Sequence, residues 1–218
     1  MILERESYHH GDLRQALIDA ALELVAEKDV SSLSLREVAR KAGVSHAAPY
    51  RHFEDKEALL AGVAEQGFGM FNQALEQATQ HISDPLERLE AGFIAYVRYA
   101  IENPTHYRIL FGSYGANATE TYPSLAVAIK LAFMQFVNTI AQGQSLGIIR
   151  AENPEKLAQS VWASSHGLAM LLIDGQLTDK ENEAMSNGQT TCDYESLSRF
   201  TIRLLMEGLL CSHSKNVC

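Results

Sequence analysis

Residues 35–53 read LREVARKAGVSHAAPYRHF, and this stretch determines the fold. Its apolar residues recur at helical spacing. Ser34, just before the stretch, and Glu37 have the spacing of a capping box, and Gly43 is suited to end this first helix. Ser45 is a suitable N-cap for a second, very short helix. Helix, glycine-containing turn and short helix make up the helix-turn-helix arrangement, whose second helix enters the major groove of DNA.

The charge of the whole chain argues against a nucleic-acid partner, whereas the charge of this stretch argues for one. The chain has 218 residues and a formal net charge of −9. Residues 36–52 carry one acid, Glu37, and four basic side chains, Arg36, Arg40, Lys41 and Arg51. We therefore expect a basic DNA-binding face on an acidic protein.

Helical spacing of apolar residues continues along nearly the whole chain, and alternating strand-like runs are nearly absent. The pattern predicts an all-α fold of about nine helices. Outside the motif, the expected ranges are about 12–27, 55–80, 85–103, 106–111, 124–144, 154–177 and 194–211. Gly62, Gly67 and Gly69 are expected to weaken the long helix 55–80 and to permit it to bend.

The sequence contains no pattern typical of a metal site, a cofactor site or a membrane protein. Three cysteines, Cys192, Cys211 and Cys218, lack metal-ligand spacing and fit a reducing cytosol. The N-terminus lacks the apolar run of a signal peptide. Charged or amide residues interrupt each apolar segment before the ~18 residues that a span requires, so we expect a cytoplasmic protein that does not contact a membrane.

The N-terminal part of the chain resembles the TetR family of transcriptional regulators. The resemblance covers residues 12–60 and depends on three ordered motifs, Ala39-Arg-Lys-Ala-Gly-Val-Ser45, Tyr50-Arg-His-Phe53 and Asp55-Lys-Glu-Ala-Leu-Leu60. It implies a three-helix DNA-binding domain, which we place at residues 12–55 after an arm of residues 1–11. Residues 56–218 are then expected to form a larger helical domain for effector binding and dimerisation.

The resemblance also implies which residues contact DNA. Contacts to phosphates are expected from Ser34, Ser45, Tyr50, His52 and Lys56. Contacts to base edges are expected from His46, Ala47 and Ala48, and the basic face adds Arg36 and Arg51. Many members have Gly, Thr and Leu before the tyrosine where this chain has Ala47, Ala48 and Pro49, so the sequence does not indicate the base specificity.

Two short segments resemble signatures of one TetR subfamily. Tyr8-His-His-Gly11 lies in the arm, which either contacts DNA or packs over the first helix. Trp162-Ala-Ser-Ser-His166-Gly167 resembles a Trp…His-Gly signature of the C-terminal domain. His166 either hydrogen-bonds an effector or is a satisfied histidine beside a helix interface.

Aromatic residues and methionines gather in the middle helices, where an effector pocket is expected to be apolar with a few hydroxyls. The candidate pocket residues are Phe71, Phe93, Tyr96, Tyr99, Phe111, Phe133, Phe136, Trp162, His166 and Met170. Two stripes with alternating spacings of four and three predict a dimer interface on the last two helices, and an internal core stripe is the alternative. The stripes are Leu157, Val161, Ser165, Leu168 and Leu172, and Leu197, Thr201, Leu204 and Gly208.

Together these features predict a dimeric DNA-binding regulator that is not an enzyme. We expect it to repress transcription, and its partners to be a double-stranded DNA operator, a second copy and a small, largely apolar or aromatic effector. One alternative is a helical interaction adaptor that does not bind DNA. Another is a helical-bundle enzyme, but the pair of Glu-x-x-His motifs on facing helices that a di-iron site requires is absent, since the sequence has one such run, Glu6-Ser-Tyr-His9, in the expected arm.

Overall fold

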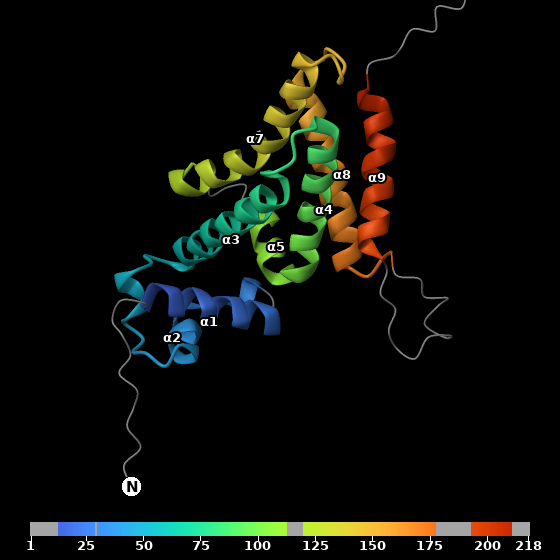
Figure 1. The fold of residues 1–218 in the computed structure, drawn as a ribbon. Helices are drawn as coiled ribbons and strands as arrows, with labels where there is room; N and C mark the ends of the chain where they lie inside the picture. Colours follow the sequence, from blue (N-terminus) through green and yellow to red (C-terminus); the bar gives the residue numbers. More distant parts are fainter. Residues whose placement is uncertain (1–12, 29, 113–119, 178–192, 211–218) are drawn as a thin grey trace, which may run out of the picture.

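The computed structural model describes residues 13–28, 30–112, 120–177 and 193–210. These residues form eight α-helices and two short 3₁₀-helices, with one isolated bridge between Ile149 and Leu210 and no strand, which confirms the all-α prediction (Figure 1). The expected arm, residues 1–11, and the three cysteines lie outside the described residues.

The N-terminal part consists of α1 (Leu13–Glu27), η1 (Val30–Ser32), α2 (Leu35–Lys41) and η2 (Pro49–Arg51). Ser34 caps α2 as predicted, since its hydroxyl accepts a hydrogen bond from the Glu37 backbone N–H at 3.3 Å and donates one to the Glu37 carboxylate. Gly43 ends the helix with a φ of +69°, a conformation that glycine adopts without strain.

The expected second helix of the motif does not form an α-helix. Residues 46–48 form turns, and one turn of 3₁₀-helix, η2, follows. Its N-cap is Ala48, without a side-chain cap bond, so the prediction that Ser45 caps this helix is wrong. The physical reason is that the helix begins at Pro49, so the N-cap position falls on Ala48, whose methyl side chain cannot accept a hydrogen bond, three residues after Ser45.

The central helices are α3 (Lys56–Thr79), α4 (Pro85–Glu102) and α5 (Pro104–Phe111). Asp55 caps α3, its carboxylate accepting from the Ala58 N–H at 2.7 Å, and Asp84 caps α4, which begins at Pro85. Helix α5 begins two residues earlier than expected because Pro104 suits the first helical position.

The C-terminal helices are α7 (Pro123–Ser145), α8 (Pro154–Ile173) and α9 (Tyr194–Leu209). Helix α8 ends four residues before the expected Leu177, because Gly175 adopts a φ of +66° just after the C-cap residue Asp174. Helix α4 lies at the centre and packs against α3, α5, α7, α8 and α9. Helix α3 runs from the N-terminal part into this bundle (Figure 1).

We expected no segment to be apolar enough to cross a membrane, but one helix is. Among the described helices, only α7 has the length and composition of a candidate span, and 39% of its most apolar window is buried. It packs against α3, α4 and α8, and the core helices of soluble proteins pass the same test. The helix is therefore weak evidence for a membrane span.

Candidate DNA-binding surface and effector pocket

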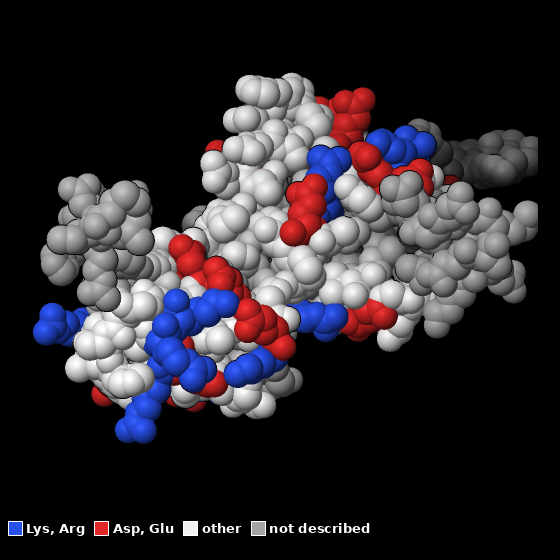
Figure 2. Space-filling model, turned by 90° about the horizontal axis from the view of Figure 1, so that it is seen from below, with Lys and Arg blue, Asp and Glu red and all other residues white. Residues whose placement is uncertain are grey.

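The expected DNA contacts gather on one end of the molecule. Seven of the ten residues are exposed, namely Arg36, Ser45, His46, Ala47, Tyr50, Arg51 and His52. The other three, Ser34, Ala48 and Lys56, are half-buried. Seen from this end, Lys and Arg side chains cluster over the N-terminal part (Figure 2). We refer to the seven exposed residues as the motif surface.

The cations of the motif differ in how far they are neutralised within the chain. The ammonium of Lys41 lies 2.9 Å from carboxylate oxygens of both Glu23 and Glu27 on α1, and these hydrogen bonds raise the pKa of Lys41. No ion pair involves Arg36, Arg40 or Arg51 within the described ranges. The three guanidiniums are therefore the charges of α2 and η2 that remain available to DNA phosphates.

The motif is held against α3 at a glycine. Phe53, which follows η2 and is 4% exposed, packs at Gly62, where an added Cβ would lie 2.9 Å from the ring. The guanidinium of Arg14 on α1 lies over the same ring, 5.4 Å from its centroid. Close approach of Phe53 and Arg14 therefore requires that α3 carry no side chain at this position.

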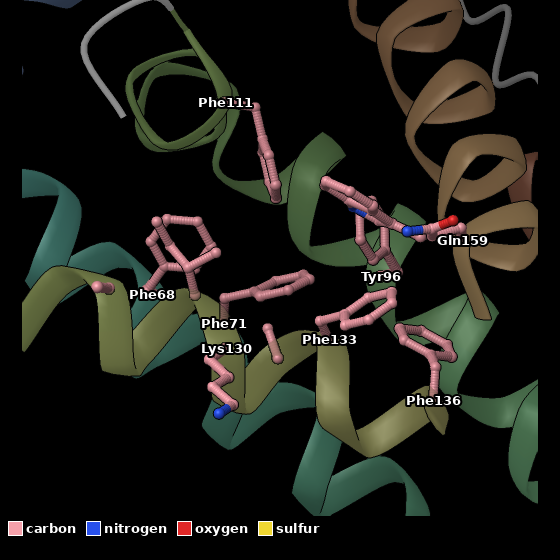
Figure 3. Close-up of a pocket in the computed structure, with 12 residues that line it drawn as sticks. Phe68, Phe71, Tyr96, Phe111, Lys130, Phe133, Phe136 and Gln159 are labelled. Atoms are coloured by element: carbon pink, nitrogen blue, oxygen red, sulfur yellow. The ribbon is translucent and has the colours of Figure 1, made fainter. Parts of the chain in front are cut away.

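Five helices enclose a cavity of about 310 Å³ in the bundle. Its lining residues are Phe68, Phe71, Tyr96, Phe111, Ala126, Ile129, Lys130, Ala132, Phe133, Phe136, Gln159 and Trp162. Phe71, Phe111 and Phe133 project toward a shared space, with Phe68 at one end and Tyr96 and Gln159 at the other (Figure 3). The walls are almost entirely apolar, which is typical of sites that bind small apolar molecules.

Six of the ten expected pocket residues line this cavity, namely Phe71, Tyr96, Phe111, Phe133, Phe136 and Trp162. Phe93 is instead fully buried in the core, and Met170 is half-buried on α8. Tyr99 donates its hydroxyl proton to the Gly67 carbonyl at 2.9 Å, and burial raises its pKa to about 12. His166 lies behind the wall, where its ring stacks on Tyr107.

The expected set omitted half of the lining. The omitted residues are Phe68, Ala126, Ile129, Lys130, Ala132 and Gln159. Four of them lie on α7, and Ala126, Ile129, Lys130 and Phe133 recur at the spacing of one helix face. That periodicity is present in the sequence, whereas aromatic and methionine content indicates none of the omitted residues except Phe68.

Two side chains of the cavity wall, Tyr96 and Trp162, form a hydrogen-bonded cluster with Tyr107 and His166 behind them. The Trp162 indole N–H donates to the Tyr96 hydroxyl at 3.1 Å. The Tyr107 hydroxyl lies 3.0 Å from that of Tyr96 and 2.6 Å from His166 Nδ1. Burial raises the pKa of both tyrosines and lowers the pKa of His166, so the cluster is neutral at pH 7.

The structure corrects the expected dimer interface. Val161, Ser165 and Leu168 are buried in the protomer's own core, so their side chains are not available to a partner. The stripe on α8 is the core stripe because α8 packs against α4 and α7 on that side. Two of the other expected residues, Leu204 and Gly208, are exposed. The remaining four are half-buried, namely Leu157, Leu172, Leu197 and Thr201.

A different face of the same two helices is apolar and, apart from the half-buried Gly167, exposed. On α8 it comprises Ala163, Gly167 and Leu171, and on α9 Phe200, Leu204 and Gly208. Phe200 is 62% exposed and Leu204 53%, which is unusual for side chains of this size. A Cβ at Gly167 or Gly208 would meet nothing within 4 Å. We refer to these six residues as the α8–α9 face.

The geometry defines a helix-turn-helix DNA-binding regulator with a separate helical ligand-binding part. Residues 17–63 match the model of the bacterial regulatory proteins of the tetR family, and residues 89–187 match that of the tetracyclin repressor-like C-terminal domain. The chain belongs to the TetR family of transcriptional regulators, whose fold is not that of an enzyme. The described residues contain no group of three or more His, Cys, Asp or Glu side chains that could hold a metal.

Solved structures share this fold. A protein of unknown function from Rhodococcus sp. RHA1 is 30% identical, with a TM-score of 0.79 over 95% of this chain and 100% of that chain. A tetR-family regulatory protein from Rhodococcus RHA1 is 20% identical, with a TM-score of 0.70 over 91% and 97% of the two chains. The fatty acid degradation regulator FadR from Bacillus halodurans is 15% identical, with a TM-score of 0.71 over 92% and 97%.

Proposed function

We propose that the protein is a dimeric repressor that binds its operator through the motif surface and releases it when a small apolar or aromatic effector occupies the cavity. The observation that carries this proposal is the position of α3. Gly62 near its start holds Phe53 of the motif, and Phe68 and Phe71 further along line the cavity. A ligand that moves α3 therefore moves the motif as well.

Two features of the motif surface support separate roles for its residues: Arg36 and Arg51 form no ion pair among the described residues, and His46 is exposed. Arg36 and Arg51 are placed to contact phosphates, which supply affinity, and His46 to reach a base edge. Two copies related by a two-fold axis would present two motifs to successive major grooves about 34–36 Å apart. An effector then acts by favouring a dimer with a different separation.

A DNA-binding titration tests the proposed function directly. Fluorescence anisotropy is measured on duplex DNA that flanks the protein's own coding region and on a scrambled duplex, each at two salt concentrations. We expect specific binding that falls steeply with salt. Equal affinity for the flanking and scrambled duplexes would contradict an operator in that region, and no binding at low salt would refute the DNA-binding role.

The α8–α9 face is the proposed dimer interface, and a charge placed in it should separate the protomers. We expect Phe200→Asp to raise the dimer dissociation constant at least tenfold, because a carboxylate would lose its hydration between apolar surfaces. Sedimentation velocity over a dilution series measures this constant. Leu146→Asp is the control, since Leu146 is equally exposed, at 60%, but follows α7. A dimer unaffected by Phe200→Asp places the interface elsewhere.

A further inference from the structure

Tyr96 joins the apolar cavity to the polar cluster behind it. Its ring lines the cavity, and its hydroxyl is within hydrogen-bond distance of Trp162 Nε1, at 3.1 Å, and of the Tyr107 hydroxyl, at 3.0 Å. Phe71 and Phe111 flank this ring, with centroids 5.0 and 6.0 Å away. A molecule in the cavity would thus meet aromatic walls, the phenol of Tyr96 and the polar side chains of Gln159 and Lys130.

The Tyr96 hydroxyl also lies 3.4 Å from His166 Nδ1, and the shorter contact of 2.6 Å between the Tyr107 hydroxyl and this nitrogen allows two arrangements of the protons. A hydroxyl carries one proton and accepts up to two hydrogen bonds, and a neutral imidazole has one N–H and one bare nitrogen. If His166 Nδ1 is bare, Tyr107 donates to it over 2.6 Å and Tyr96 donates to Tyr107. The proton of Tyr96 is then used inside the cluster, and none remains for a ligand.

If His166 carries its proton on Nδ1 instead, the two hydrogen bonds that link His166, Tyr107 and Tyr96 reverse their direction, and the Trp162 N–H still donates to Tyr96. His166 donates to Tyr107, and Tyr107 donates to Tyr96. The Tyr96 oxygen then accepts two hydrogen bonds, from Tyr107 and from the Trp162 indole N–H, which fills both of its lone pairs. The remaining proton of Tyr96 has no partner in the cluster, and only an acceptor in the cavity would satisfy it.

From this arrangement we infer that the cavity takes a planar aromatic ligand with a carbonyl oxygen that accepts a hydrogen bond from the Tyr96 hydroxyl. The ring of the ligand packs among Phe71, Phe111 and Phe133, and its oxygen lies at the end formed by Tyr96 and Gln159 (Figure 3). Binding selects the second proton arrangement, in which Tyr96, Tyr107 and His166 of α4, α5 and α8 keep their mutual hydrogen bonds and Tyr96 also donates to the ligand. The inference rests on the proposed effector role of this cavity.

The test compares two probes of nearly equal shape, 2-acetylnaphthalene and 2-ethylnaphthalene, of which only the first has a carbonyl. Isothermal titration calorimetry gives a dissociation constant for each probe with the wild-type protein and with Tyr96→Phe. The ratio of the two constants cancels the hydration of the free probes. We expect this ratio to shift about fivefold against the ketone in Tyr96→Phe, the size of one hydrogen bond.

Tyr99→Phe is the matched control. Tyr99 lies on the same helix and is also buried, but its hydroxyl bonds the Gly67 carbonyl and does not line the cavity. The ratio in this variant should equal the wild-type ratio. An unchanged ratio in Tyr96→Phe, an equal shift in Tyr99→Phe, or binding of neither probe by the wild-type protein overturns the inference.

This experiment contains no DNA, so its outcome is independent of the operator titration. A ketone preference that depends on Tyr96, in a protein that binds no DNA, would support the ligand class and refute the repressor role. Specific DNA binding without a ketone preference would do the reverse.

Discussion

Replacing Arg36 and Arg51 together with alanine is expected to weaken binding to duplex DNA about 100-fold, because each guanidinium supplies a charge-assisted hydrogen bond to a phosphate. Both side chains are exposed, and neither is paired with an acid in the part of the chain that the structure describes. The slope of log affinity against log salt should fall by about two per protomer, since each lost phosphate contact removes about 0.9.

Lys41→Gln is the control for this prediction. It removes one positive charge from the same helix as Arg36, but the ammonium of Lys41 is already neutralised by Glu23 and Glu27. Its salt slope should equal that of the wild-type protein, and the loss of these exposed ion pairs should leave the stability almost unchanged. If Lys41→Gln lowers the slope as much as the arginine pair does, the DNA-binding face has been misplaced.

A count of charges in the sequence does not predict which cations of the motif remain unpaired. The motif has three more basic residues than acidic ones, but the sequence does not indicate that α1 brings Glu23 and Glu27 to Lys41. Ion pairs between helices depend on tertiary packing, and net charge over a segment does not include them. The arginines remain as the cations that the fold leaves unpaired within the described residues.

Local signals in the sequence predicted helix ends better than they predicted which face of a helix is buried. The caps at Ser34, Asp55 and Asp84 depend on residues three positions apart or fewer, so they could be predicted from the sequence. The α8 stripe has the spacing of an interface, but the same spacing describes a core stripe. Only the packing of α8 against α4 and α7 places Val161 and Leu168 inside.

In the candidate pocket, too, some features could be predicted from the sequence and others could not. Aromatic composition indicated six of its lining residues, because large apolar side chains are the usual walls of such a cavity. The hydrogen-bonded cluster of Tyr96, Tyr107, Trp162 and His166 joins three helices across long separations in the sequence. No local pattern in the sequence predicts that these four residues meet.

The glycines of α3 give the second prediction with a large expected effect. From the sequence, Gly62 and Gly69 are both expected to weaken the helix. In the structure, however, the space around the two positions differs. A Cβ at Gly62 would lie 2.9 Å from Phe53 and 3.2 Å from Arg14, and one at Gly69 would meet nothing within 4 Å. We expect Gly62→Ala to lower the free energy of unfolding by about 1–2 kcal/mol, because the buried Phe53 ring must move.

Gly69→Ala is the matched variant, with the same substitution in the same helix at an exposed position. It should raise the free energy of unfolding by about 1 kcal/mol through helix propensity alone. Urea unfolding followed by circular dichroism, at one protein concentration for all variants, measures both values. Because Phe53 ends the motif, Gly62→Ala should also weaken DNA binding, and Gly69→Ala should not. Equal effects of the two substitutions would mean that the motif is not held against α3 at Gly62.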